Sequence, residues 1–101
     1  MLKADVITLV KETEKTRGVH ESAVQTGREV MCTVKSVTRS EYYTAYNAGM
    51  EPALVFELAL AEDYEDERLI IYHGKEYTVI RTYMTDADGI EITVQRKDEN
   101  T

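Results

Sequence analysis

The chain has 101 residues, of which 43% are hydrophobic and 31% are charged. This length fits one small domain and the apolar fraction is enough for a buried core, which excludes a second catalytic domain and a disordered chain. Twelve Lys and Arg against nineteen Asp and Glu give a net charge of −7, which argues against a protein that holds nucleic acid on a basic surface.

The single cysteine and the N-terminal residues bear on the compartment. Cys32 cannot form an intrachain disulfide, and its place in an apolar alternation predicts a buried, inert thiol and a reducing compartment. No apolar run approaches the roughly 18 residues that a membrane span requires. Lys3 and Asp5 interrupt any signal-peptide core, so we expect a soluble protein that is not processed at this end.

The first third of the chain predicts two strands joined by a long loop. Residues 5–11 place Ile7 and Leu9 on one face and Val6, Thr8 and Val10 on the other, which is consistent with a strand covered on both sides, and residues 28–37 alternate in polarity. Residues 12–27 contain two glycines and show no regular period, which predicts a long loop that is either functional or disordered. The side chains expected on the core face of the second strand are Val30, Cys32 and Val34.

Residues 39–48 carry a helix signature. Thr38 and Glu41 fit a capping box, and Ser40 is a second possible N-cap. A glycine and a proline follow the segment and predict its end. A helix of about three turns is marginal alone, so it is expected to dock on another surface.

Tyrosines mark one side of this predicted helix. Tyr42 and Tyr46 are four residues apart and share a face, and Tyr43 is adjacent. Without interleaved Lys or Arg, the three rings do not resemble a surface on which bases stack. We expect them either to pack on the sheet or to meet a neighbouring subunit.

Two further segments follow the helix. Residues 54–60 alternate strictly and predict a strand with its leucines and Phe56 on one face. The run of acidic residues at 62–67 is too charged for a core and predicts a solvated turn.

The C-terminal third predicts a meander of three strands. Residues 69–72 and 76–85 should pair around a tight turn at 73–75, and a turn at 86–89 should lead to a last strand at 90–95. In the second of these strands, the alternation places three side chains on one face, opposite Ile80 and Met84: Tyr77, Val79 and Tyr83.

Together these elements predict a mainly β fold class. We expect a single domain over residues 1–101, built as a small antiparallel β-barrel-like domain of about six strands with one inserted short helix. Closure into a barrel would hide the strand edges. The tail at residues 97–101 is expected to be flexible.

No catalytic, cofactor-binding or metal site is predicted. His20 and His73 are the only histidines, and neither has a partner at metal-ligand spacing, so both are expected to be exposed turn residues. Cys32 lacks a histidine partner for nucleophilic catalysis. Asp86 and Asp88 do not continue into a calcium-loop pattern.

Three segments are more informative together than alone. They are SEYYTAYNAGMEP at residues 40–52, YHGKEYTVIR at residues 72–81 and IEITVQR at residues 90–96. In order and spacing they resemble the head-closure proteins, also called stopper or head-completion proteins, of long-tailed bacteriophages that infect Gram-positive hosts. DVITLV at residues 5–10 also fits, so the resemblance extends over residues 5–96. The long segment 12–27 and the acidic run 62–67 depart from the simplest family members.

The resemblance implies a virion structural protein of the head-tail connector. Such a protein would assemble in the host cytoplasm into a ring, expected to be dodecameric, below the portal and adaptor ring. It would close the DNA-filled head and offer a surface to tail-completion or tail proteins. Packaged DNA would pass through without sequence-specific binding, and an acidic ring would repel its backbone. With a net charge of −7, the isolated chain is expected to be a monomer.

Three alternatives stay open. The runner-up is a tail-completion or terminator ring protein, the next is a small β-barrel protein-binding module, and an enzyme comes third. No cofactor is expected for a head-closure protein. The residues predicted to contact a protein partner are Tyr42, Tyr43, Tyr46, Arg17, His20 and Glu21.

Overall fold

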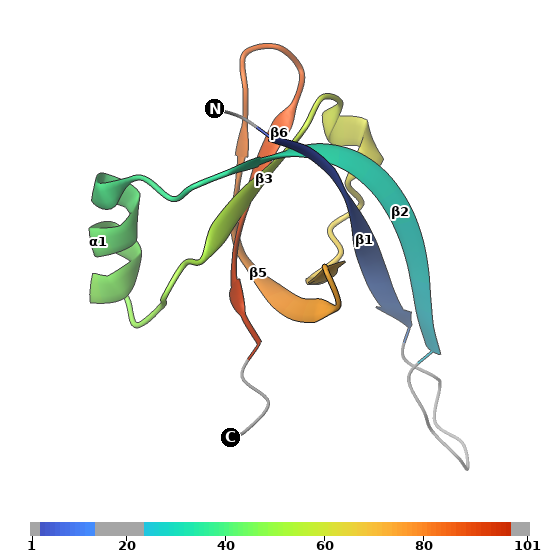
Figure 1. Ribbon diagram of the computed structural model, residues 1–101, viewed down its shortest axis with the longest axis horizontal. Coiled ribbons are helices and arrows are strands. Elements are labelled where there is room, and N and C mark those ends of the chain that lie inside the picture. The colour runs from blue at the N-terminus through green and yellow to red at the C-terminus, as the bar shows by residue number, and fades with distance from the viewer. Residues whose placement is uncertain (1–2, 14–23, 98–101) are drawn as a thin grey trace.

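The computed structural model describes residues 3–13 and 24–97, which fold into a closed six-stranded β-barrel with one α-helix (Figure 1). The sheet order is β1-β2-β3-β6-β5-β4, and all neighbouring strands are antiparallel. The predicted fold class is therefore confirmed. The elements in chain order are β1 (Lys3–Thr13), β2 (Val24–Lys35), α1 (Arg39–Asn47), β3 (Leu54–Leu58), the 3₁₀ turn η1 (Ala61–Asp63), β4 (Leu69–Tyr72), β5 (Lys75–Met84) and β6 (Ile90–Arg96).

The barrel interior is filled by alternate side chains of the strands. Phe56 is 0% exposed, and its ring meets those of Tyr72 and Tyr77 with centroid distances of 5.1 and 6.3 Å. Of the residues predicted to face inward in the second strand, Cys32 is buried, and Val30 and Val34 pack against the core. In the first strand, Ile7 and Leu9 lie in the core, and Val10 on the other face is only 4% exposed.

The β1–β2 hairpin is longer than predicted. The antiparallel register continues to the pair Thr13–Val24, so the ends of the predicted loop 12–27 belong to strands. Gly27 does not end the strand but pairs with Val10 inside it. The pairing in this part of the hairpin is made by backbone hydrogen bonds, which do not require alternating apolar side chains. A prediction based on alternating polarity therefore missed these strand residues. The rest of this loop, residues 14–23, lies outside the described residues.

A bulge in β5 corrects the predicted face of its second half. Val79 pairs with Val94, but Arg81 pairs with Thr93, so one residue of β5 is extra. An extra residue reverses which side chains point inward beyond that point. Tyr83 was predicted to share the face of Tyr77 and is instead 58% exposed.

Smaller boundary differences occur elsewhere. β3 ends at Leu58, and Leu60, which the alternation placed on the core face, is 47% exposed. β2 ends two residues before the predicted limit of 37. Of the tail predicted to be flexible, Lys97 is described, and its N–H donates to the carbonyl of Glu76 at 3.0 Å. Residues 98–101 lie outside the described part.

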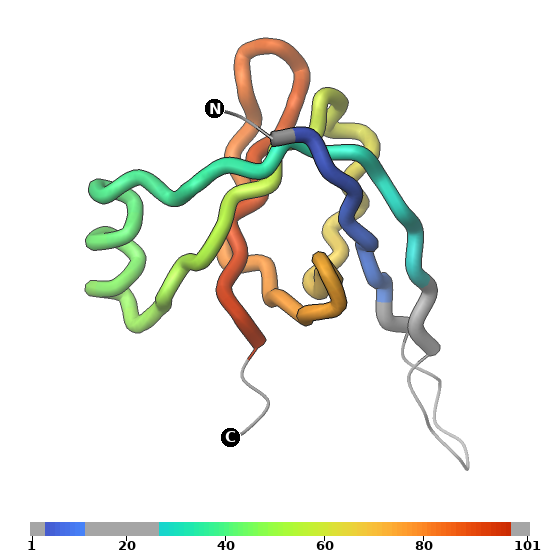
Figure 2. Tube along the Cα trace, viewed as in Figure 1, coloured from blue at the N-terminus to red at the C-terminus, as the bar shows by residue number. Residues whose placement is uncertain are grey.

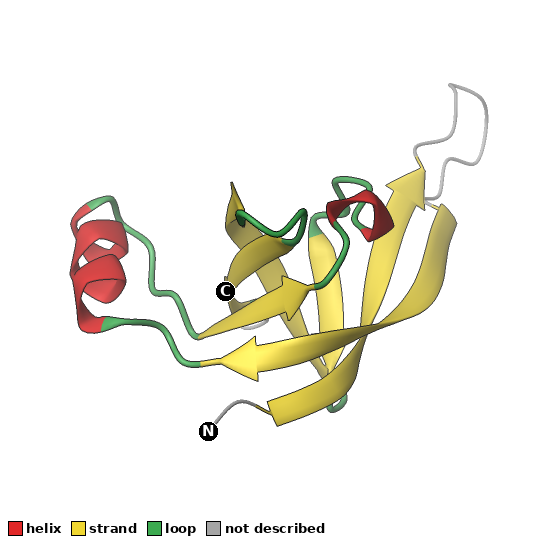
Figure 3. Ribbon diagram, turned by 90° about the horizontal axis from the view of Figure 1, so that it is seen from above, coloured by secondary structure: helices red, strands yellow, loops and turns green. Residues whose placement is uncertain are grey.

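The chain leaves the barrel once between β2 and β3 and returns after α1, as the tube in Figure 2 shows. Viewed from above, α1 stands beside the barrel at the end of two connecting segments (Figure 3). Within the described residues, no helix has the length and apolarity to cross a membrane.

Gly89 closes the turn between β5 and β6 against the backbone of β3. A Cβ placed on Gly89 would lie 2.6 Å from the carbonyl oxygen of Leu58 and 3.2 Å from that of Ala59. We expect Gly89→Ala to lower the free energy of unfolding by about 1–3 kcal/mol, because backbone atoms must shift to relieve the clash. Urea unfolding followed by circular dichroism measures this. Gly89 does not have a positive φ, so a loss below about 0.5 kcal/mol would contradict the steric explanation.

Candidate interaction surface on the inserted helix

Both ends of α1 are capped by local hydrogen bonds. The Thr38 hydroxyl accepts a hydrogen bond from the Glu41 N–H at 3.1 Å, which confirms Thr38 rather than Ser40 as the N-cap. At the other end, the N–H groups of Gly49 and Met50 donate to the carbonyls of Tyr46 and Ala45, and Gly49 has a φ of 86°. This is a Schellman motif, which needs a left-handed residue where the glycine stands. The predicted helix 39–48 is confirmed within one residue.

Glu41 attaches the helix to the barrel. Its Oε2 accepts a hydrogen bond from the Thr93 hydroxyl of β6 at 2.9 Å and lies 3.5 Å from Nη1 of Arg81 on β5. In a full capping box this side chain would turn back to the Thr38 N–H. Here it reaches out to the outer face of β5 and β6 instead. Thr93 points away from the core but is only 4% exposed.

The side of α1 that faces the barrel carries Glu41 and otherwise small residues. Glu41, Ala45 and Ala48 line a cavity of about 200 Å³ together with Ile80 and Thr93 of the sheet. No residue of α1 is buried. The helix therefore rests on its caps and on Glu41 more than on an apolar contact.

The three tyrosines lie on the other side of α1. At about 100° per residue, Tyr43 is turned roughly 200° from Glu41 around the helix axis. Tyr43 is 59% and Tyr46 is 56% exposed, whereas Tyr42 is half-buried. The rings of Tyr42 and Tyr46 stack with centroids 5.9 Å apart and planes 16° apart. Of the pair Tyr42 and Tyr46, for which packing on the barrel was one alternative, Tyr46 is therefore exposed and Tyr42 is half-buried.

The structure brings together only half of the predicted contact residues. Tyr42, Tyr43 and Tyr46 form one surface, while Arg17, His20 and Glu21 lie outside the described residues. Sequence reasoning missed Arg39, which lines an open hollow with Val37, Tyr42 and Tyr43. Its position three residues before Tyr42 would have placed it on this side of the helix. We define the helix surface as Arg39, Tyr42, Tyr43 and Tyr46.

Glu67 is the exception to the predicted solvated turn at 62–67, in which Glu62, Asp63, Glu65 and Asp66 are exposed. The Glu67 side chain is 2% exposed and accepts a hydrogen bond from Nη2 of Arg28 at 2.8 Å. Its other oxygen accepts the N–H of Glu65 at 2.7 Å. Burial alone would raise the pKa of Glu67, but these hydrogen bonds and the charge of Arg28 hold that pKa below its usual value. The Tyr64 hydroxyl donates to the Glu67 carbonyl at 2.6 Å, and burial raises the pKa of Tyr64 to about 12.

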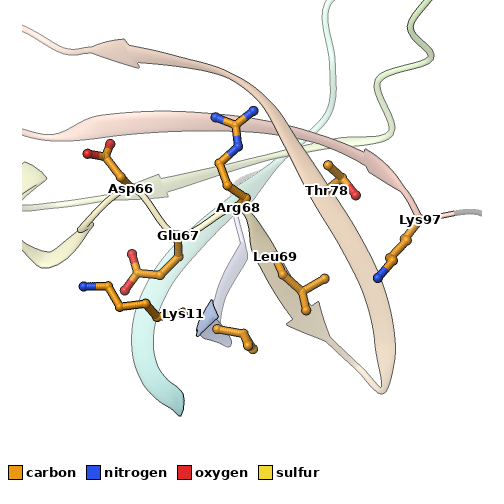
Figure 4. Close-up of a pocket in the computed structure, with 8 residues that line it drawn as sticks. Lys11, Asp66, Glu67, Arg68, Leu69, Thr78 and Lys97 are labelled. Carbon is orange, nitrogen blue, oxygen red and sulfur yellow. The ribbon is translucent and has the colours of Figure 1, made fainter. Parts of the chain in front are cut away.

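A hollow of about 460 Å³ lies beside Glu67 on the outer side of β1, β4 and β5 (Figure 4). Its rim carries Lys11, Arg68 and Lys97 as well as Asp66. The charged ends of these three basic residues point in different directions in Figure 4. They do not converge on one point, so this hollow is a poor site for a single anion.

A second polar cluster joins the β4–β5 turn to β1. The Tyr72 hydroxyl donates to Oδ2 of Asp5 at 3.0 Å, and Nε2 of His73 lies 3.1 Å from the same oxygen. Hydrogen bonds from the Val6 N–H and from Tyr72 lower the pKa of Asp5. His73 is 59% exposed in its side chain, which confirms it as an exposed turn residue. Within this cluster, Asp5 acts as a tether between strands.

Cys32 lies opposite Asp5 in the β1–β2 ladder, on the core side. Burial and, secondarily, the charge of Asp5 raise the pKa of its thiol to about 11. The thiol is therefore protonated at neutral pH and a weak nucleophile. Within residues 3–13 and 24–97, no three His, Cys, Asp or Glu side chains are close enough together to hold a metal ion. Comparison with known protein families and with curated proteins gave no match to this chain.

Because Tyr46 is exposed, Tyr46→Ala should change the free energy of unfolding by no more than about 0.5 kcal/mol. The stacked contact with Tyr42 is the main intramolecular interaction that it loses. Thermal unfolding of the two proteins measures the difference. A loss above about 2 kcal/mol, typical of a core residue, would mean that Tyr46 packs inside the fold.

Proposed function

We propose that the chain is a structural protein of a bacteriophage head-tail connector, acting in head closure. In this role it forms a ring below the portal and adaptor proteins, retains the packaged DNA and receives the tail. The protein performs this role by binding other proteins, without catalysis, and it resides at the head-tail interface of the virion.

The observation that carries this proposal is the exposed helix surface. The segment that presents it, residues 40–52, is also the first of the three segments that resemble head-closure proteins. Aromatic rings and arginine are enriched at protein interfaces and in their hot spots. No residue of α1 is buried, yet the helix is capped at both ends and is tied to the barrel by Glu41. This arrangement holds the helix in place with its outer side exposed to a partner.

The fold and the charge support the same role. Closure of the barrel pairs part of every strand on both sides, although residues 24–32 of β2 pair with β1 alone. The net charge of −7 favours a channel wall that DNA passes without adhering.

The experiment is a deletion of the gene in the phage or prophage that encodes the chain. We expect particles that package DNA but lose it and carry no tails, and that complementation by the wild-type protein restores infectivity. Plaque titre, nuclease-protected DNA and electron microscopy of the particles measure this. Stable DNA-filled heads together with separate tails whose ends are malformed would instead indicate the tail-completion role. Normal infectious particles would refute both connector roles.

Variants of the helix surface refine the same assay. Complementation by a Tyr43→Ala/Tyr46→Ala protein should fail by at least 100-fold in titre, since aromatic hot spots dominate such interfaces. Tyr83→Ala is the matched control, because Tyr83 is equally exposed but lies on β5. Equal titres for both proteins would show that the helix surface has no part in assembly.

A further inference from the structure

The helix surface and a second exposed patch lie on opposite sides of the barrel. In a closed order of six strands, the strand three places away lies across the barrel, so β6 is opposite β1 and β5 is opposite β2. Glu41 fixes α1 outside β5 and β6. Accordingly, α1 is at one end of the long dimension in Figure 1 and the β1–β2 hairpin is toward the other.

The outer face of this hairpin carries exposed apolar side chains. Val6 and Met31 are direct cross-strand partners and are 43% and 72% exposed. Glu29 is two residues from Met31 on the same face, and it is exposed and pairs with Thr8. We define the hairpin surface as Val6, Thr8, Glu29 and Met31.

The two surfaces are complementary in chemistry. The helix surface offers aromatic rings and one cation, Arg39, whereas the hairpin surface offers a thioether, a valine and one anion, Glu29. Methionine sulfur makes favourable contacts with aromatic rings. A flexible Met31 side chain can also adapt to the stacked pair Tyr42 and Tyr46.

We propose that the helix surface of one copy binds the hairpin surface of a second copy, with Arg39 facing Glu29. Because the two surfaces differ and point in opposite directions, the contact is heterologous and repeats from copy to copy. Such a contact closes into a ring or extends into a filament, depending on the rotation between copies. The inference deepens the proposed function, and rests on it, by naming the partner of the helix surface as a neighbouring subunit.

Each contact should be weak in solution. Every copy carries a net charge of −7, and the two surfaces are small, so repulsion between subunits opposes association. A template that holds copies side by side raises their effective concentration and lets weak contacts add up.

The test exchanges the two charges between copies. Arg39→Glu alone and Glu29→Arg alone each place like charges in every contact, so each protein should self-associate about three- to tenfold more weakly than wild type. In an equimolar mixture, each variant meets opposite charges on the other, and association should return to near the wild-type value. Sedimentation velocity at high protein concentration and low salt measures the self-association of each variant and of the mixture. If the mixture associates no better than the separate variants, the pairing of Arg39 with Glu29 is refuted.

Cysteine cross-linking tests the geometry independently of affinity. Tyr43→Cys and Met31→Cys proteins, mixed and oxidised, should give cross-linked heterodimers in excess over either homodimer. The native Cys32 is buried with a raised pKa, so it contributes little background. Predominant Tyr43→Cys homodimers would indicate a symmetric contact between helices and overturn the proposal.

The two proposals fail separately. If the deletion yields leaking, tailless heads but the cross-link is absent from assembled particles, the connector role stands and the interface is wrong. If the cross-link forms in solution and the deletion has no effect on particles, the interface stands and the connector role is wrong.

Discussion

Phe56→Ala should remove about 3–5 kcal/mol of the free energy of unfolding. Phe56 is 0% exposed at the centre of the barrel, with edge contacts to the rings of Tyr72 and Tyr77. Truncation loses the transfer free energy of the ring and leaves a cavity, which strands tied into a closed barrel cannot easily collapse. Because domains of this size have only about 5–15 kcal/mol in total, a large unfolded fraction at 37 °C is the expected outcome.

Urea unfolding at 25 °C, followed by circular dichroism, gives the free energy directly. Tyr83→Ala is the matched aromatic control, since Tyr83 is 58% exposed and should change stability by at most about 0.5 kcal/mol. A Phe56→Ala loss below about 1.5 kcal/mol would show that the interior repacks around the missing ring, and would contradict the expected cavity.

The strands of this fold were predictable because their inward side chains alternate with polar ones. Phe56 and Leu58 in β3, and Ile92 and Val94 in β6, follow this pattern without interruption. The helix was predictable because Thr38 and Gly49 mark its two ends by local backbone chemistry. Both signals act within a few residues of each other in sequence, which is the range over which sequence patterns can be interpreted.

The missed features depend on contacts between distant residues. Glu67 sits within a run of acidic residues, and its burial depends on Arg28, which is 39 residues away. The bulge in β5 follows from how β5 fits against β6, and no residue type in its sequence marks it.

The sequence predicted which tyrosines form the candidate site but not which way the site faces. The spacing of Tyr42 and Tyr46 showed that they share a face. Only the link from Glu41 to Thr93, 52 residues later, determines that this face is turned away from the barrel. The sequence left open whether this face packs on the barrel or meets a neighbouring subunit, because the attachment is a polar tether and not an apolar stripe.

Acid should destabilise the protein in a way that depends on Glu67. The pKa of Glu67 in the folded protein is held below its usual value of 4.5 by Arg28 and by the Glu65 N–H, against the opposing effect of burial. A carboxyl whose pKa is lowered by folding stabilises the protein at pH values above its unfolded pKa. That stabilisation is lost as pH falls from about 4.5 through the lower folded value. Asp5 acts in the same direction, since its pKa is also lowered.

Glu67→Gln isolates the contribution of this carboxylate. At pH 7 we expect a loss of about 2–3 kcal/mol, because the buried amide keeps the size of the side chain but not its charge-assisted bond with Arg28. Arg28 is 37% exposed, and solvent screening keeps the loss below that of a fully buried pair. Below the folded pKa, wild-type Glu67 is itself neutral, so the stability curves of the two proteins should converge as the pH falls below 4.5 and through that folded pKa. Glu62→Gln, an exposed neighbour, should leave the wild-type curve almost unchanged. A difference between Glu67→Gln and wild type that stays constant from pH 7 through the whole acid unfolding range would mean that packing, rather than the ion pair with Arg28, makes Glu67 important.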